Sequence, residues 1–464
     1  MTAERASVCV IGAGISGLTA AFWLTREGID PVVLEKEPWP GGTMRTVRDD
    51  GWLIETGPNS ALETTPLIGE MTSMIGLERE YADAASTRRY ILRGGELHAI
   101  PMSPGAFLRT RLWSTRGKLR LLKEPFVGRA GREESIAEFV ERRLGREFLD
   151  YAINPFVAGV YAGNPEELSV RSAFPKLYAL EEKYGGLIRG MIRGARERKA
   201  RAETAKDRAR MFSFRDGMQS FPDALARSLE GRIRYGAAVR TVARAPHGFT
   251  VTFERDGSLE QLVAESVVLA VPAFAAIPMV AGLAPDLSRC LGEIYYPPVA
   301  EVFMGFRSEQ VGRPLDGFGY LIPAREQRKI LGTIWSSALF GGRAPAAHAA
   351  FTTFVGGSRQ PELAGLPDGE MRDVVLAELR SIMRITGDPV LTRIIRWPKA
   401  IPQYRLGYQE TVERIERAES ANPGFFVCAN YRGGIAVGDC VINGEKTARR
   451  ILQTTPRDRS GAGA

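Results

Sequence analysis

Cysteine and histidine are scarce in this sequence, and neither is spaced as a reactive or metal-binding site requires. The chain of 464 residues has four cysteines and three histidines, and no two cysteines form a CxxC pair. These residues are Cys9, Cys290, Cys428, Cys440, His98, His247 and His348. We therefore expect neither a dithiol redox centre nor a metal site, and nothing in the cysteine content indicates an oxidising compartment.

A long uncharged apolar segment is also lacking. The N-terminus has no secretory signal pattern, because a strand-like stretch starts at Val8 with no charged region and apolar core before it. Residues 266–285 carry no charge, but Pro272 and Pro278 divide them, and their first part is typical of a buried strand that leads into a loop. A membrane-spanning helix is not expected, and the cytoplasm is the predicted location.

The bulk composition is that of a globular protein. Hydrophobic residues make up 44% of the chain, and the length predicts two or three domains. The net charge of +8 is mild for this length, and no RNA- or DNA-binding signature accompanies it. Nucleic acid is therefore not an expected partner.

The most informative segment is residues 8–17 (VCVIGAGISG), near the start of the chain. A strand pattern runs into a GxGxxG sequence formed by Gly12, Gly14 and Gly17, and a helical pattern follows. The first glycine allows a tight turn, the second lets a pyrophosphate approach the backbone, and the third lets the helix pack on its strand. Glu35 follows 18 residues after Gly17, where a carboxylate accepts from a ribose hydroxyl and would repel a 2′-phosphate. These features predict a Rossmann-like unit that binds NAD or FAD.

Two further turns favour FAD. Residues 40–46 (PGGTMRT) place a cation, Arg45, three residues after Gly42, and this turn is expected to form a second wall for a diphosphate and an isoalloxazine. Residues 55–60 (ETGPNS) add backbone donors that are predicted to approach the flavin ring. Each turn alone is compatible with ordinary loop chemistry, so the interpretation depends on their order behind the fingerprint. A reductase linked to a pyridine nucleotide usually needs a second fingerprint, which favours an oxidase.

Positive and apolar side chains are interleaved between residues 107 and 132. The cations are Arg109, Arg111, Arg116, Lys118, Arg120, Lys123, Arg129 and Arg132. The apolar residues are Phe107, Leu108, Leu112, Trp113, Leu119, Leu121 and Leu122, which we expect to be exposed. Such a mixture suits the surface of an anionic membrane and predicts peripheral attachment. A second basic run, residues 189–210, is better explained by a solvated helix face.

The chain pattern predicts an α/β protein whose nucleotide-binding domain is assembled from three separated pieces. Residues 89–100 are typical of a hairpin that turns at its two adjacent glycines, and residues 103–209 are mainly helical and basic. Strand patterns follow at residues 211–217, 232–235, 248–253 and 267–271, and a separate sheet is expected between residues 301 and 354. Residues 424–439 predict a strand, a glycine-rich turn and a helix that directs its N-terminus at the flavin.

Taken together, these segments resemble the protoporphyrinogen oxidases, a family within the flavin amine oxidase superfamily. The resemblance covers nearly the whole chain. It rests on residues 57–60 (GPNS), 89–90 (RY), 155–163 (PFVAGVYAG), 168–169 (LS), 213–219 (SFRDGMQ), 318–323 (FGYLIP), 336–337 (SS), 353–359 (TFVGGSR), 401–404 (IPQY) and 435–440 (IAVGDC). Many motifs in one order are far more specific than any one of them.

The resemblance implies a Rossmann-like FAD-binding domain, an α+β substrate-binding domain and a helical membrane-binding domain. The expected boundaries are residues 1–80, 211–275 and 415–464 for the FAD-binding domain, 81–102 and 276–414 for the substrate-binding domain, and 103–210 for the helical domain. It also implies a cytoplasmic protein that is peripherally associated with the cytoplasmic membrane. The candidate protein partners are a second copy of the chain and a ferrochelatase.

The implied activity is the FAD-dependent oxidation of protoporphyrinogen IX to protoporphyrin IX in haem biosynthesis, with oxygen as acceptor and hydrogen peroxide as product. Six electrons leave in three cycles, each with a hydride from a meso carbon and a proton from a pyrrole nitrogen. The flavin carries this chemistry, so no side chain is nominated as a catalytic base. The alternatives are coproporphyrinogen III oxidation and a flavoprotein that carries a porphyrin without turnover. A flavin amine oxidase is disfavoured, because residues 430–439 depart from the turn that those enzymes carry.

The resemblance assigns five substrate-binding residues. Arg89 would pair with a substrate propionate, to which a planar guanidinium can donate two charge-assisted hydrogen bonds. Leu321, Ile334 and Phe354 fall on positions that sandwich the apolar macrocycle, and the backbone of Gly159 would lie against it.

The expected cofactor site is larger. Its residues are Gly12, Ala13, Gly14, Ile15, Ser16, Gly17, Glu35, Lys36, Gly42, Thr43, Arg45, Gly57, Pro58, Asn59, Ser60, Val239, Ile435, Ala436 and Val437. Val239 would make a backbone contact with adenine, and residues 435–437 would touch the isoalloxazine. The chain departs from the family pattern at residues 340–345 (FGGRAP), at Asn164 and at Thr43.

Overall fold

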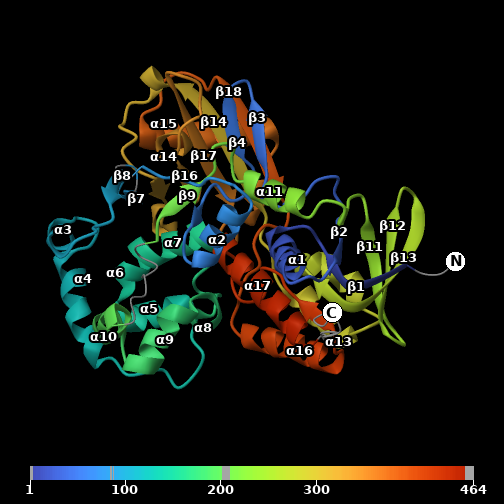
Figure 1. Cartoon of the computed structure of the whole chain (residues 1–464). Helices are drawn as coiled ribbons and strands as arrows, with labels where there is room; N and C mark the ends of the chain where they lie inside the picture. Colours follow the sequence, from blue (N-terminus) through green and yellow to red (C-terminus); the bar gives the residue numbers. More distant parts are fainter. Residues whose placement is uncertain (1–3, 84–85, 87, 201–208, 455–464) are drawn as a thin grey trace.

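The structure is a computed structural model that describes residues 4–83, 86, 88–200 and 209–454. These residues form three neighbouring parts (Figure 1). A seven-stranded sheet holds the N-terminal strand, a second seven-stranded sheet lies above it in this view, and the helices between residues 104 and 200 lie at the left.

The first sheet takes its strands from three separated stretches of the chain. Its strands are β1 (Glu4–Ile11), β2 (Pro31–Leu34), β10 (Ile233–Arg234), β11 (Ala238–Ala245), β12 (Gly248–Arg255), β13 (Ser258–Leu269) and β19 (Phe425–Val427). β1 pairs in parallel with β2 and β13, whereas β11, β12 and the first half of β13 are antiparallel. The second half of β13 pairs in parallel with β19. The end of β1 is buried without interruption, as a parallel strand covered on both faces requires.

Helices cover both faces of this sheet. They are α1 (Ile15–Arg26), α2 (Pro66–Met74), α11 (Ser220–Ser228), α12 (Ala273–Val280), α13 (Pro285–Glu293), α16 (Tyr408–Ala421) and α17 (Val437–Thr454). The core that contains Val8 and Val10 is shared by α1, α2, α11 and α17. The core that contains Cys9 and Ile11 is shared by α12, α13 and α16. α1 and α17 pack closely, because a Cβ on Gly444 would lie 2.7 Å from the carbonyl oxygen of Ser16. The stretch after β13 continues into α12, where a loop was expected.

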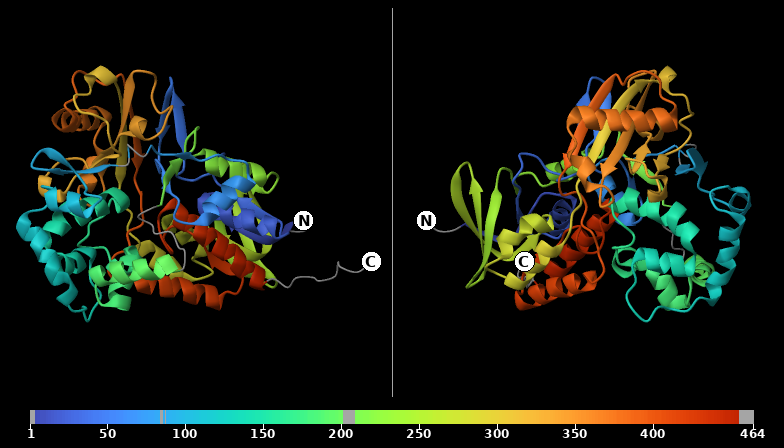
Figure 2. Two further views of the ribbon diagram at one scale, coloured as in Figure 1. Left: turned by 60° about the vertical axis from the view of Figure 1, so that its left-hand side comes forward. Right: turned by 180° about the vertical axis from the view of Figure 1, so that it is seen from behind.

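The second sheet runs in the order β18-β14-β17-β16-β15-β7-β8. Its strands are β7 (Arg89–Arg93), β8 (Glu96–Ala99), β14 (Val299–Arg307), β15 (Gly319–Leu321), β16 (Gly332–Ile334), β17 (His348–Gly356) and β18 (Leu391–Trp397). Helix α15 (Asp368–Met383) lies across the outer face, as the view from behind in Figure 2 shows, and shares a core with Val302 and Phe351. Short helices between the strands are η5 (Ser308–Gln310), η6 (Ala324–Glu326), α14 (Ser336–Leu339) and η7 (Pro361–Gly365).

The opposite face of this sheet meets an N-terminal ribbon. The ribbon consists of β3 (Thr46–Asp49) and β4 (Trp52–Glu55), and the rings of Trp52 and Phe303 lie 5.7 Å apart. A segment that follows the phosphate turn thus packs on the second sheet.

The hairpin β7–β8 turns at Gly94 and Gly95, as expected. The strand expected at residues 211–217 is shorter, and it lies outside the sheet that holds the strands expected at residues 232–235, 248–253 and 267–271. β9 (Met211–Ser213) forms a small sheet with β5 (Ala61–Leu62) and β6 (Glu80–Tyr81). β11, which carries Val239, was not among the expected strands.

Residues 104–200 form the helical part. Its helices are α3 (Pro104–Arg109), α4 (Thr115–Arg120), η2 (Leu121–Phe126), α5 (Ile136–Arg143), α6 (Arg146–Phe148), η3 (Leu149–Ile153), α7 (Asn154–Tyr161), α8 (Val170–Ala173), α9 (Pro175–Tyr184) and α10 (Leu187–Ala200). The fully buried Arg143 ties them together through Glu124 at 3.0 Å and Glu181 at 2.8 Å. Among the described residues, no helix is both long and apolar enough to cross a bilayer.

The expected exposure of the apolar residues in this part is correct for some and wrong for others. Leu108 and Leu122 are exposed at 73% and 69%. Leu112 and Trp113 are buried, because they fill a small core against β7 and η3 in which Trp113 stacks on Phe148 at 4.7 Å. Part of the second basic run, residues 201–208, lies outside the described residues.

Candidate cofactor and substrate site

The phosphate turn has the close contacts that its glycines were expected to allow. Gly12 has a φ of +103° and donates from its N–H to the carbonyl of Leu34 at 2.8 Å. A Cβ on Gly17 would lie 2.0 Å from the carbonyl oxygen of Gly12, so only glycine lets α1 approach the turn. Gly14 differs, because no atom lies within 4 Å of the position of its Cβ. The turn is therefore tight on its protein side and open at the N-terminus of α1, where no side chain caps the helix.

Glu35 is buried beneath this turn. Its carboxylate accepts hydrogen bonds from the N–H groups of Ala13 at 2.7 Å and Glu37 at 2.9 Å. Its backbone oxygen accepts from the N–H of Ala237, which places the start of β11 and Val239 beside the acid. The side chain of Lys36 is largely exposed and pairs with Glu37.

The second glycine turn lies directly against the first. Gly41 donates to the carbonyl of Ala13 at 2.8 Å, and a Cβ on Gly42 would lie 3.6 Å from the Cα of Gly14. Arg45 stacks over the ring of Trp39 at 4.0 Å, and its Nε has no hydrogen-bond partner among the described residues. A donor that is buried and unused fits a diphosphate ligand.

The third turn is fixed to the second. A Cβ on Gly57 would lie 1.9 Å from the carbonyl oxygen of Thr43, and the N–H of Thr56 donates to Arg45. Asn59 closes the turn by donating to the carbonyl of Gly57 at 3.2 Å, and Pro58 and Ser60 flank it. The three predicted flavin turns are thus neighbours in space.

The turn before α17 is set by Tyr404, which belongs to the motif of residues 401–404 and was not predicted as a site residue. The Tyr404 hydroxyl donates to Asn430 at 2.5 Å and accepts from the N–H of Gly434 at 3.1 Å. Ile435 and Val437 then pack on the two cores of the first sheet, whereas Ala436 between them is exposed. This arrangement leaves the backbone at residue 436 accessible beside the N-terminus of α17.

The expected substrate residues share one face of the second sheet. The first row across β7, β15, β16 and β17 is Arg89, Gly319, Ile334 and Thr352, and the second row is Ile91, Leu321, Gly332 and Phe354. Residues two positions apart on a strand point to the same side, so four of the five expected substrate residues are aligned. The fifth, Gly159 on α7, faces them, because a Cβ there would lie 2.5 Å from Cδ2 of Leu321.

Arg89 is a cation that contacts solvent but is partly surrounded by protein. It lies over the ring of Phe318 at 5.7 Å, and no ion pair or hydrogen bond of its side chain occurs with the described residues. Surrounding protein lowers the pKa of Arg89 by desolvation, although the residue is also exposed to solvent. The guanidinium is therefore partly desolvated and has no countercharge among the described residues. An anion would be stabilised there.

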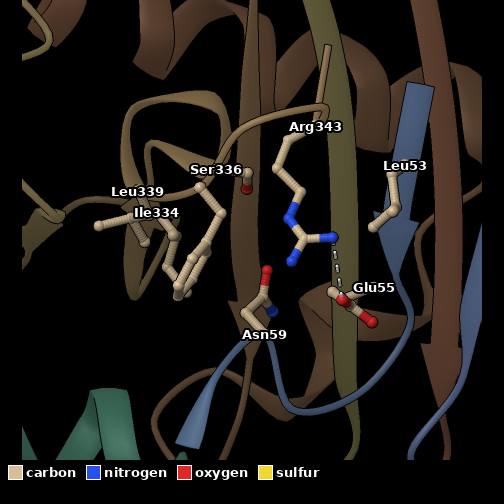
Figure 3. Close-up of a pocket in the computed structure, with 8 residues that line it drawn as sticks. Leu53, Glu55, Asn59, Ile334, Ser336, Leu339 and Arg343 are labelled. Atoms are coloured by element: carbon tan, nitrogen blue, oxygen red, sulfur yellow. Dashed lines mark ion pairs between the residues drawn. The ribbon is translucent and has the colours of Figure 1, made fainter. Parts of the chain in front are cut away.

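A small cavity connects the cofactor and substrate residues (Figure 3). Its lining consists of Leu53, Glu55, Asn59, Ile334, Ser336, Leu339, Phe340 and Arg343. Asn59 comes from a predicted flavin turn and Ile334 from the predicted macrocycle wall. Glu55 and Arg343 were not proposed as site residues, since one was part of a turn motif and the other lies in the segment where the sequence departs from the family pattern.

The turns fit FAD, and the described residues contain no group of three or more histidine, cysteine or acidic side chains that could hold a metal. The chain matches the family described as flavin containing amine oxidoreductase over residues 15–452. It is 34% identical to protoporphyrinogen oxidase 2, chloroplastic/mitochondrial, of Arabidopsis thaliana over 96% of this chain and 93% of that protein. It is 28% identical to coproporphyrinogen III oxidase of Bacillus subtilis over 97% of this chain and 99% of that protein.

Solved structures show the same fold. A crystal structure from Exiguobacterium sp. 255-15 matches with a TM-score of 0.79 at 24% identity, covering 98% of this chain and 100% of that chain. A putrescine oxidase variant matches with a TM-score of 0.74 at 16% identity, with the same coverage. The expectations of an FAD cofactor and of an oxidoreductase are thereby confirmed. The chain belongs to the flavin containing amine oxidoreductase family and, within it, to the group formed by the protoporphyrinogen and coproporphyrinogen III oxidases.

Proposed function

We propose that the protein oxidises protoporphyrinogen IX to protoporphyrin IX in haem biosynthesis, with oxygen as acceptor and hydrogen peroxide as product. The observation that carries the proposal is the wall of Arg89, Leu321, Ile334 and Phe354 beside the three flavin turns. One unpaired cation next to an apolar surface suits a flat macrocycle with carboxylate arms. The names of the relatives point to the same class of substrate.

The flavin supplies the electron sink for this reaction when bound. The chain's own residues bind and orient the substrate. Arg89 would hold a propionate through charge-assisted hydrogen bonds, and Leu321 and Phe354 would exclude water from the macrocycle. The close approach of Gly159 to Leu321 depends on the missing side chain, because a Cβ at Gly159 would lie 2.5 Å from Cδ2 of Leu321.

Coproporphyrinogen III is the competing substrate, because relatives with that name span the chain equally well. Two features favour protoporphyrinogen. Six relatives named protoporphyrinogen oxidase are 30–34% identical to this chain, whereas two named coproporphyrinogen III oxidase are 28% identical. In addition, Arg89 is the one cation in the two rows of the wall, and a substrate with four carboxylates would need more. A porphyrin carrier without turnover is the other alternative.

We also propose three domains with the boundaries expected from the sequence. The FAD-binding domain would comprise residues 1–80, 211–275 and 415–464, and the substrate-binding domain residues 81–102 and 276–414. Residues 103–210 would form the membrane-binding domain. The packing of Trp52 on Phe303 supports a direct contact between the first two domains.

Peripheral attachment to the cytoplasmic membrane is part of the proposal. Side chains of Met102, Leu108, Leu122 and Phe126 are 69–85% exposed. They lie among the cations of residues 109–123, and this combination suits insertion into the headgroup region of an anionic bilayer. A second copy of the chain and a ferrochelatase are the candidate protein partners.

Purified flavin-loaded protein tests the activity directly. Protoporphyrinogen IX should yield fluorescent protoporphyrin with uptake of three oxygen molecules and release of three peroxides for each porphyrin. Porphyrin formation without oxygen uptake would assign another acceptor. Tight porphyrinogen binding without oxidation above the spontaneous rate would identify a carrier instead.

A further inference from the structure

Helix α7 has its middle against Leu321 of the proposed substrate wall, and its C-terminal end is held by two donors from other segments. The last carbonyl groups of a helix have no partner within it. The carbonyl of Ala162 accepts from the N–H of Ser358, just after β17, at 2.7 Å. The carbonyl of Tyr161 accepts from Nε2 of Gln403 at 2.8 Å, and Gln403 is 2% exposed. A buried side chain thus fixes the end of the helix that faces the wall.

Tyr404, the next residue after Gln403, holds the predicted flavin turn. Its hydroxyl donates to the carbonyl of Asn430 at 2.5 Å and accepts from the N–H of Gly434 at 3.1 Å. Tyr404 is 3% exposed, and its ring stacks on that of Tyr408 at 4.4 Å. One hydroxyl therefore bridges the two ends of the turn directly before the expected flavin contacts.

The segment that carries these two side chains is itself fixed on both sides. The N–H of Gln403 donates to the carbonyl of Tyr295, before β14, at 2.9 Å. The carbonyl of Tyr404 accepts from the N–H of Ser169, in the helical part, at 2.8 Å. Nε2 of Gln403 also donates to the carbonyl of Ile401 at 3.0 Å, which fixes the orientation of the side chain amide. Adjacent residues of one fixed segment thus contact α7 and the flavin turn.

We propose that Gln403 and Tyr404 are positioning residues that set the separation between α7 and the flavin turn. This inference rests on the proposed function, because it takes α7 to bound the substrate space and residues 435–437 to contact the flavin. Gln403 acts through the helix and Tyr404 through the turn. The reacting carbon of the substrate and its acceptor would therefore be held through one short segment, and a shift of about 1 Å between them is enough to lower the rate about 100-fold.

Hydrogen–deuterium exchange tests this connection without turnover. Adding FAD to the flavin-depleted wild type should slow exchange at least about threefold in the turn, residues 430–436, and in α7. Exchange of α15 in the same samples corrects for overall stabilisation by the cofactor. In Gln403→Met, FAD should still slow exchange in the turn but no longer in α7. If FAD leaves α7 unaffected in the wild type, or protects it equally in Gln403→Met, the connection does not exist.

FAD titration tests the role of Tyr404 at the turn. Tyr404→Phe keeps the ring and loses both hydroxyl bonds, so FAD should bind the flavin-depleted variant about tenfold more weakly than the wild type. Tyr320→Phe is the matched control, because Tyr320 is 2% exposed, its hydroxyl accepts from Thr333 at 3.0 Å and it lies in the core under α15. The control should keep the wild-type affinity. An unchanged affinity in Tyr404→Phe would overturn its assignment.

Anaerobic flavin bleaching at saturating FAD and porphyrinogen tests the role in the reaction. Gln403→Met should keep the wild-type FAD affinity but lower the limiting rate about tenfold or more. Tyr404→Phe should lower the same rate. Both changes disturb one separation, so the loss in the double variant should be smaller than the product of the single losses. Losses that multiply would show two independent defects and contradict the proposal.

The proposed function and the positioning role fail in different ways. If porphyrinogen does not bleach the wild-type flavin, the proposed function is wrong, and exchange and FAD titration still decide whether residues 403 and 404 connect the helix and the turn. If the wild type bleaches and both variants match its rate, only the positioning role is wrong. Gln403→Glu keeps the size of the side chain and replaces the Nε2 donor with an acceptor, so it provides the same test if Gln403→Met folds poorly.

Discussion

Replacing Arg89 with alanine separates substrate binding from protein stability. Arg89 has no carboxylate partner among the described residues, and desolvation lowers its pKa, so this cation is not expected to stabilise the folded protein. Arg89→Ala should therefore bind substrate less well, with an unfolding temperature equal to or above that of the wild type. If the main role of Arg89 were structural, Arg89→Ala would lower the unfolding temperature and leave substrate binding unchanged.

The size of the effect follows from the bonds that the guanidinium would make. A hydrogen bond to a charged group contributes about 1.5–3 kcal/mol, and a mid-range loss of about 2 kcal/mol corresponds to a KM about 30-fold higher. Lysine keeps the charge but not the planar fork, so Arg89→Lys should raise KM about tenfold. The limiting rate of flavin bleaching should change little, because the propionate lies away from the reacting carbon.

Steady-state kinetics with protoporphyrinogen IX and its dimethyl ester is the assay. For the wild type, the ester should raise KM by as much as Arg89→Ala raises it for the free acid. For Arg89→Ala, KM should be the same for the ester and for the free acid. Arg88→Ala is the matched control, since this neighbouring arginine is paired with Asp316 at 2.7 Å and exposed; its KM should stay within about twofold. An unchanged KM in Arg89→Ala, or an equal ester effect in both proteins, would refute the propionate assignment.

Three further changes have defined outcomes. Gly17→Ala should reduce the flavin content of purified protein at least about tenfold, measured by absorbance, because its Cβ would lie 2.0 Å from the carbonyl of Gly12; full flavin content would contradict the packing. The double substitution Leu122→Ser and Phe126→Ser should reduce the amount of protein that sediments with anionic liposomes about tenfold, with turnover unchanged. Equal sedimentation of this variant and the wild type would show that these residues do not contact the membrane. The folded pKa of Glu55 is raised from 4.5 to about 7, so its stabilising contribution is present below pH 4.5 and is lost as the pH rises through about 7. Between pH 4 and 8 the free energy of unfolding should therefore fall by about 3 kcal/mol more in wild type than in Glu55→Gln, and parallel urea-denaturation curves would contradict this.

The phosphate turn could be predicted because its geometry is local. Gly12, Gly14 and Gly17 lie within one strand-turn-helix unit, and each has a separate steric or electrostatic reason to be glycine. The position of Glu35 follows from the length of the next strand. The same argument made the hairpin of residues 89–100 predictable.

Pairing between distant segments was beyond a single sequence. Arg89 and Leu321 share a face only because β7 pairs with β15, and the family resemblance, not any local pattern, brought these residues together. The neighbouring side chains of Glu55 and Arg343 in the cavity were missed for the same reason, since they come from two separate segments. Trp113 was expected on the surface because a mixed apolar and basic pattern does not reveal which side chains fill a small core.

The most direct test of the central claim is anaerobic stopped-flow absorbance of the flavin-loaded protein, mixed separately with protoporphyrinogen IX and coproporphyrinogen III. Protoporphyrinogen should bleach the flavin faster than coproporphyrinogen at equal concentration. Faster bleaching by coproporphyrinogen would contradict the proposed substrate and assign the enzyme to the tetracarboxylate, and no bleaching by either would contradict the proposed activity itself.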